Sequence, residues 1–185
     1  MTRVSLIRRF GAAGATALFA CSSVAAQAAS QGSLGGTSQG QITISASVPN
    51  SVQITGLSDI AFTNQDPTVA AAGTENVCVW SNTGTKGYNI KATGSGLSNA
   101  FTLANSGNTV PYAVEWAATS GQNSGTSLTS GTPLTGLTTT AVNATCSSAP
   151  LTTASLIVRI STANLQTMVG SASYTGTLTL LVAPE

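Results

Sequence analysis

The side chains that most often carry out catalysis are scarce in this chain. Its 185 residues contain no histidine, and Lys, Arg, Asp and Glu together make up 6%. Without histidine, the many Ser and Thr hydroxyls lack the base of a hydrolase triad, and no His-ligated metal site can form. With so few acids, Asp59 with Asp66 and Glu75 with Glu115 are better explained as chance neighbours than as acid–base couples. We therefore expect no enzymatic activity and no cofactor.

The chain is equally poor in residues that could bind nucleic acid or phosphate groups. Beyond position 30 the basic residues are Lys86, Lys91 and Arg159 alone, too few for a stripe that could bind nucleic acid. The glycine-rich stretch Gly94-Ser95-Gly96 is followed by neither a lysine nor a helical pattern, so it does not indicate a phosphate-binding loop. We expect no nucleic-acid partner.

The first 28 residues have the pattern of an export signal. Met1 to Arg9 carries three arginines and no acid, Phe10 to Ala20 is apolar, and the small residues Ala26-Gln27-Ala28 follow. This order is typical of a secretory signal peptide, with cleavage expected after Ala28. Lipidation at Cys21 is the less favoured alternative. The apolar run is shorter than the roughly 20 residues of a membrane span, and no later stretch approaches one.

Removing the signal leaves two cysteines, Cys78 and Cys146. An even pair in an exported chain predicts a disulfide, and two buried free thiols are the alternative. A disulfide closing so long a loop would stabilise the fold by about 4 kcal/mol on the chain-entropy model.

The remaining chain has the two-residue period of β-strands. After a Gly/Ser-rich lead over residues 29–40, apolar and polar residues alternate in runs separated by Gly, Asn and Ser. Such runs favour half-buried strands. They lie at 42–48, 52–54, 76–80, 88–92, 110–116, 156–160 and 174–182. We expect one all-β domain over residues 41–185, an immunoglobulin-like antiparallel sandwich of about seven to nine strands.

Two details of the interior follow from the same reading. One helical turn is expected within Thr162 to Val169, where Leu165 and Met168 tolerate it. Trp80 and Trp116 are expected in or at the edge of the core, and a sugar-stacking platform is the alternative.

The N-terminal strand carries a resemblance to a known family. Ile42-Thr43-Ile44-Ser45-Ala46-Ser47-Val48-Pro49, followed by Val52-Gln53-Ile54, resembles the N-terminal strand of colonisation-factor-antigen-type fimbrial subunits, pilins of an alternative chaperone–usher class. The middle segment 110–116 and the final run Tyr174-Thr175-Gly176-Thr177-Leu178-Thr179-Leu180 are similar to later strands of those pilins. More loosely, the chain is similar to spore-coat-U-like domains and other bacterial secreted sandwiches.

The resemblance implies assembly by strand exchange. Such pilins lack their last immunoglobulin strand, and a periplasmic chaperone fills the resulting groove before an outer-membrane usher replaces it with the next subunit's N-terminal strand. On this reading residues 41–54 contain the donor strand, which inserts Ile42, Ile44, Ala46 and Val48. Leu178, Leu180 and Val182 line the acceptor groove. The resemblance therefore implies a pilus shaft subunit, exported through the periplasm to the cell surface, with further copies of itself as partners.

A different class of function remains open at this stage. The chain could be a self-complete secreted or surface domain that binds glycan or matrix. In that case residues 42–48 pair within their own domain instead of entering a neighbour. The residues alone leave pairing in cis and pairing in trans as alternatives.

Overall fold

A computed structural model describes residues 28–185. The expected signal peptide up to residue 27, including Cys21, lies outside the described residues. The chain separates between Ser47 and Val48 into two units, which are described separately. Among residues 28–185 there is no helix of the length and hydrophobicity that a bilayer crossing requires.

The N-terminal unit has one local pairing. Ser30 and Gln41 form an isolated antiparallel bridge, in which Ser30 N donates to Gln41 O at 2.9 Å and Gln41 N to Ser30 O at 3.0 Å. The alternating run that follows it is exposed and lies in no strand. Apolar alternation alone does not make a strand, because main-chain groups need a neighbouring strand to bond to.

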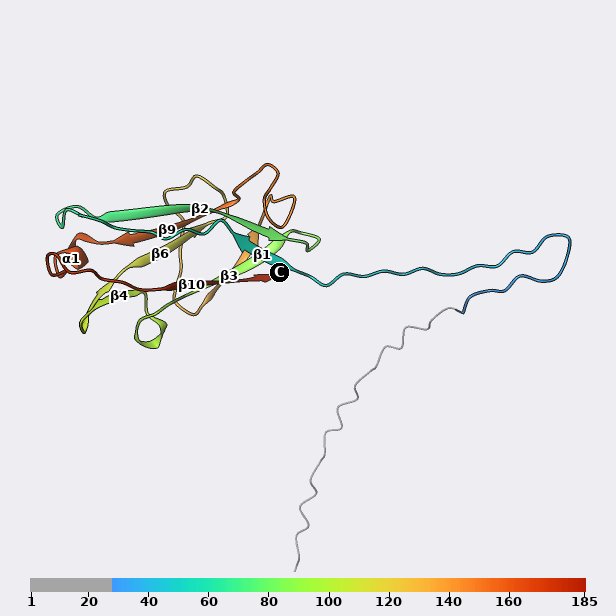
Figure 1. The fold of residues 1–185 in the computed structure, drawn as a ribbon, viewed down its shortest axis with the longest axis horizontal. Helices are drawn as coiled ribbons and strands as arrows, with labels where there is room; N and C mark the ends of the chain where they lie inside the picture. Colours follow the sequence, from blue (N-terminus) through green and yellow to red (C-terminus); the bar gives the residue numbers. More distant parts are fainter. Residues whose placement is uncertain (1–27) are drawn as a thin grey trace, which may run out of the picture. The chain divides into compact units, whose positions relative to one another are not determined.

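The second unit is an antiparallel β-sandwich, as expected, with ten strands instead of seven to nine. Its two main sheets form the upper and lower layers in Figure 1. One sheet has the order β1(Val52–Thr55), β2(Ala71–Ser81), β9(Ala154–Ile160), β6(Ala113–Ala117), β7(Thr126–Ser127). The other has the order β10(Leu178–Pro184), β3(Gly87–Gly94), β8(Pro133–Thr138). β4(Thr102–Asn105) and β5(Asn108–Pro111) form a hairpin, and η1(Leu97–Asn99) and α1(Thr162–Leu165) are short helices.

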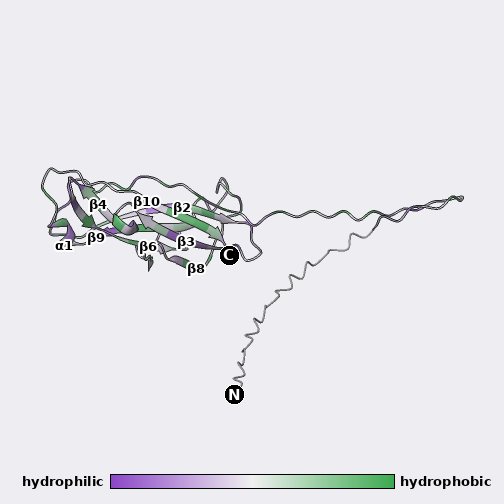
Figure 2. Cartoon of the chain, turned by 90° about the horizontal axis from the view of Figure 1, so that it is seen from below, coloured by the Kyte–Doolittle hydropathy of each residue, from purple (hydrophilic) through white to green (hydrophobic). Residues whose placement is uncertain are grey.

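The core lies between the two sheets and follows from the two-residue period. Figure 2 shows hydrophobic residues concentrated on strands such as β2 and β6. Trp116 is the largest fully buried side chain, and its indole N–H donates to the hydroxyl of Tyr88 on the facing sheet at 3.1 Å. The other core side chains include Val77, Val79, Ile90, Ala92, Val114, Ala154, Leu156, Val158 and Ile160.

A second, smaller cluster lies on the outer face of β2. Cys78 lies between the core residues Val77 and Val79, so its side chain points to the opposite face of the strand. There it forms the expected disulfide with Cys146, at a Cα–Cα distance of 6.1 Å. Trp80 packs against this disulfide and is partly exposed. Trp80 therefore lies outside the main core, whereas Trp116 lies within it.

Candidate functional site: a groove between two sheet edges

The sandwich has a free edge on each sheet along the same side. β1 ends the first sheet and β10 ends the second, and neither has a further strand partner within the described residues. Val182 of β10 packs against the core, as do Val52 and Ile54 of β1. The two edges approach each other over β1, and beyond β1 they are separated by a groove.

The first side of the groove is formed by residues 57–67. β1 ends before Gly56, whose positive φ of 78° favours glycine, and the chain then continues without strand pairing. Ile60 and Phe62 lie over Gly73 of β2, where a Cβ would collide with the Ile60 side chain. At the far end, Asp66 Oδ1 accepts from Thr68 N at 2.8 Å and from Thr68 Oγ1 at 2.7 Å, and these bonds lower the pKa of Asp66.

The opposite side is formed by residues 168–178, which precede and begin β10. This segment is tied to the β4–β5 hairpin by an isolated bridge, with Ala104 N donating to Thr175 O at 2.8 Å and Thr175 N to Ala104 O at 3.1 Å. Gly176 is tightly placed, since a Cβ there would lie 2.7 Å from Thr102 O. The segment therefore has a defined path although it carries little strand structure of its own.

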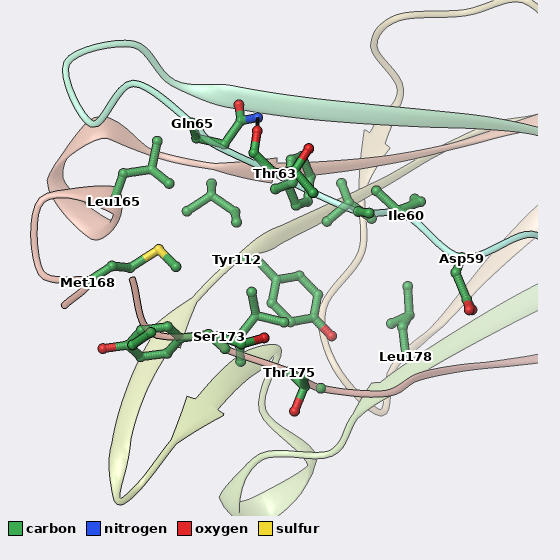
Figure 3. A pocket seen from close by; sticks show the side chains of 18 of the residues that line it. Asp59, Ile60, Thr63, Gln65, Tyr112, Leu165, Met168, Ser173, Thr175 and Leu178 are labelled. Atoms are coloured by element: carbon green, nitrogen blue, oxygen red, sulfur yellow. Dashed lines mark hydrogen bonds between the residues drawn. The ribbon is translucent and has the colours of Figure 1, made fainter. Parts of the chain in front are cut away.

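The groove between these two segments reaches the interior of the sandwich. It has a volume of about 1210 Å³. In Figure 3 residues 57–67 run along one side and residues 170–178 along the other, with Tyr112 between them. The buried side chains that reach it are Tyr112, Leu156, Val158, Ile160 and Leu165. The volume exceeds the 300–1,000 Å³ of most small-molecule sites.

Helix α1 closes one end of this groove. Ser161 caps the helix by accepting from Asn164 N at 3.2 Å, which satisfies one of the otherwise unpaired N–H groups of the first turn. The turn places Leu165 in the groove, and Met168 follows just beyond it (Figure 3). The single helical turn expected from the sequence is thus confirmed and contributes to the groove.

Tyr112 is the aromatic residue at the centre of the groove. Its ring stacks on Phe101 with the ring centres 5.7 Å apart. Burial raises the pKa of its hydroxyl, because the ionised form is poorly solvated there. The sequence predicted one continuous strand over residues 110–116, but the structure interrupts it at Tyr112, between β5 and β6. No sequence pattern indicated that the Tyr112 ring would line a groove.

The groove is almost free of charge. Among the described residues that line it, Asp59 alone is charged, and that side chain is exposed on the rim. An anionic occupant would lose hydration without gaining a partner, and Asp59 on the rim is the one charged lining side chain among the described residues that could pair with a cationic occupant. The lining therefore favours an uncharged segment with an apolar face.

The residues expected to act in assembly fall into three positions. Leu178 and Leu180 line the groove, whereas Val182 packs against the core without lining it. Ile42, Ile44 and Val48 have exposed fractions of 75%, 85% and 82%, and Ala46 is exposed as well. Residues 57–67, Tyr112, Leu165 and Met168 were not anticipated as groove residues. Their positions depend on long-range packing that no local pattern reports.

Comparisons with known proteins do not assign a family. No family model matches the sequence, and no curated protein matches it closely enough to be reported. One solved chain with a similar structure comes from work described as "Chaperone-tip adhesin complex is vital for synergistic activation of CFA/I fimbriae biogenesis", with a TM-score of 0.43 and 11% identity. The match covers 72% of this chain and 42% of that one. Similarity at this level does not place the chain in a family.

Proposed function

We propose that this protein is a non-enzymatic structural subunit that polymerises by inserting residues 41–48 of one copy into the groove of the next. The observation that carries the proposal is the groove itself, which lies between residues 57–67 and the edge strand β10, has an apolar floor, and has Asp59 as the one charged side chain among its described lining residues. The same chain carries an exposed, alternating apolar segment directly before β1. Exposing apolar side chains of this kind to water is unfavourable, and such a surface indicates a site of protein–protein interaction.

The donor segment and the groove match in polarity. Residues 29–58 contain no charged side chain, so the segment can enter the groove without burying an unpaired charge. An inserted strand would bond through its main chain to the free edge of β10 and place every second side chain on the groove floor. Burying Ile42, Ile44 or Val48 would contribute about 1.5–3 kcal/mol for each side chain.

The proposal includes the path to the cell surface. A subunit whose core is open is prone to misassembly, so a periplasmic chaperone would fill the groove until an outer-membrane usher exchanges it for the next subunit's strand. The finished product would be the shaft of a fimbrium, with copies of this chain as the repeating unit.

Deletion followed by peptide addition tests the proposal. We expect the chain from residue 29 to form SDS-resistant ladders under non-reducing conditions, and the chain lacking residues 29–48 to form none. An added peptide of residues 42–54 should bind the shortened chain and raise its unfolding temperature, because it supplies the missing strand.

A stable monomer at all concentrations would contradict the proposal. If deletion of residues 29–48 also destroyed that monomer and the peptide failed to restore it, the segment would belong to its own domain. The chain would then be a self-complete secreted binding domain.

A further inference from the structure

Asn82, the residue directly after β2, is hydrogen-bonded to residues 49–51, the segment that joins the donor segment to β1. Its side-chain oxygen accepts from Ser51 N at 2.6 Å, and its side-chain N–H donates to Pro49 O at 2.9 Å. Its main-chain N–H donates to Ser51 O at 3.1 Å. One residue therefore holds three main-chain groups of residues 49–51.

These bonds prolong the pairing of β1 with β2. The ladder pairs Val52 with Ser81, and the bond from Asn82 N to Ser51 O adds one more position at its end. The two side-chain bonds of Asn82 then extend the attachment back to Pro49. Residues 49–51 are thus held as a continuation of β1 along the end of β2.

This geometry bears on whether a chain can fill its own groove. To do so, residues 41–48 would have to run back beside β1 and residues 57–67, which requires the chain to reverse within residues 49–51. Three residues are enough for a hairpin loop. Such a loop would need to release Ser51 and Pro49 from Asn82, because a reversing chain turns its main-chain groups away from the end of β2.

We propose that Asn82 is the positioning residue that makes strand insertion intermolecular, by holding residues 49–51 in line with β1 and so preventing the donor segment from folding back into its own groove. This inference rests on the proposed function. On this inference the exposed residue Asn82 determines whether the chain forms a closed monomer or a polymer.

The test compares Asn82→Ala with the unmodified chain, both starting at residue 29 and refolded at the same concentration. Loss of two side-chain hydrogen bonds should raise the ratio of monomer to SDS-resistant polymer by about fivefold or more. The Asn82→Ala monomers should also fail to bind a labelled peptide of residues 42–54, because their own residues 41–48 occupy the groove. Asn82→Asp, which keeps the acceptor for Ser51 N but loses the donor to Pro49 O, should give an intermediate ratio.

Two further variants separate this role from a general loss of stability. Asn143→Ala removes another asparagine that holds a loop, a half-buried one whose Oδ1 accepts from Ser147 N at 3.0 Å, and it should leave the ratio unchanged. Insertion of Gly-Gly between Asn50 and Ser51 provides a turn while Asn82 stays in place, and it should increase closed monomers in the same way. If Asn82→Ala does not fold, this insertion tests whether the constraint on residues 49–51 is what prevents the donor segment from entering its own groove.

The outcomes for the inference and for the proposed function differ. Asn82→Ala monomers that bind the peptide as the unmodified monomers do, or an unchanged ratio, would overturn the role of Asn82 while strand exchange stands. An unmodified chain that neither polymerises nor binds the peptide would overturn the proposed function itself.

Discussion

Ile44 is the most exposed of the three large apolar donor side chains, at 85%, and it should be the most sensitive of them to charge. Ile44→Asp would carry a carboxylate into a groove where nothing pairs with it, and the one charged side chain on the rim, Asp59, has the same sign. We expect polymer yield to fall about tenfold or more, with export unchanged. The measurement is the SDS-resistant ladder from cells expressing each variant.

Thr43→Asp provides the matched control for this prediction. Thr43 alternates with Ile42 and Ile44, so an inserted strand would point it away from the groove floor. It should polymerise nearly as well as the unmodified chain. Equal losses in both variants would contradict side-specific insertion.

Two buried tyrosines make the fold sensitive to alkali. Burial raises the pKa of Tyr88, partly offset by the hydrogen bond from Trp116, and burial also raises the pKa of Tyr112. A folded state that favours the neutral phenol keeps its full stability below about pH 10 and loses it as pH rises beyond that.

Urea midpoints measured from pH 8 to pH 11.5 should therefore decline above pH 10. Tyr112→Phe should make this decline shallower, because it removes one of the groups responsible. A midpoint that stays constant to pH 11 would contradict the assignment.

At the scale of single elements, the first side of the groove depends on Gly73. A Cβ on Gly73 would collide with Ile60 and lie 3.2 Å from the Phe62 ring, so Gly73→Ala should push residues 57–62 away from β2. We expect a loss of about 1–3 kcal/mol in the free energy of unfolding and weaker binding of the donor peptide.

Gly84→Ala is the control for this change, because a Cβ there meets nothing within 4 Å. It should leave both the free energy of unfolding and peptide binding close to those of the unmodified chain. Peptide affinity that is unchanged in Gly73→Ala would show that residues 57–62 do not shape the groove.

The disulfide holds the loop that follows β8 against the outer face of β2. Cys78 and Cys146 are 68 residues apart, so a Cys78→Ser/Cys146→Ser variant should lose about 4 kcal/mol in the free energy of unfolding. Denaturant unfolding measures this loss. Added reductant should destabilise the unmodified chain to a similar extent and leave the variant unaffected, and a reductant effect on the variant would contradict the assignment.

Most strands could be predicted from alternation, but alternation alone was not sufficient. Strands β1, β2, β3, β6 and β9 overlap the expected runs, whereas residues 42–48 alternate as strictly and form no strand. β8 was missed because its two leucines, Leu134 and Leu137, are three residues apart, which reflects a bulge in its pairing with β3. The final strand begins at Leu178, later than the expected Tyr174, because residues 173–176 contact β4 of the β4–β5 hairpin instead of pairing with β3.

The residues of the candidate site could likewise be predicted only in part. Leu178 and Leu180 could be placed there from the resemblance, since they alternate on the last strand. Tyr112, Leu165 and residues 57–67 come together only through the packing of distant segments, and no local pattern encodes that arrangement.

At the scale of the whole molecule, this sandwich combines an open apolar groove with an exposed apolar segment. Each would be a liability in an isolated secreted domain. Together they are complementary in polarity and are joined in one chain, which is what a self-polymerising subunit needs. Insertion between copies generates a head-to-tail contact, and such contacts extend into filaments when they do not close into rings.

A cross-linking experiment tests this account most directly. A photoreactive amino acid at position 44 would be introduced into ¹⁵N-labelled chains, which are then assembled with unlabelled copies. The account predicts mixed-isotope cross-links from residue 44 to residues 57–67 or 168–180 of another copy. Cross-links confined to one isotope, or reaching other parts of the surface, would contradict it.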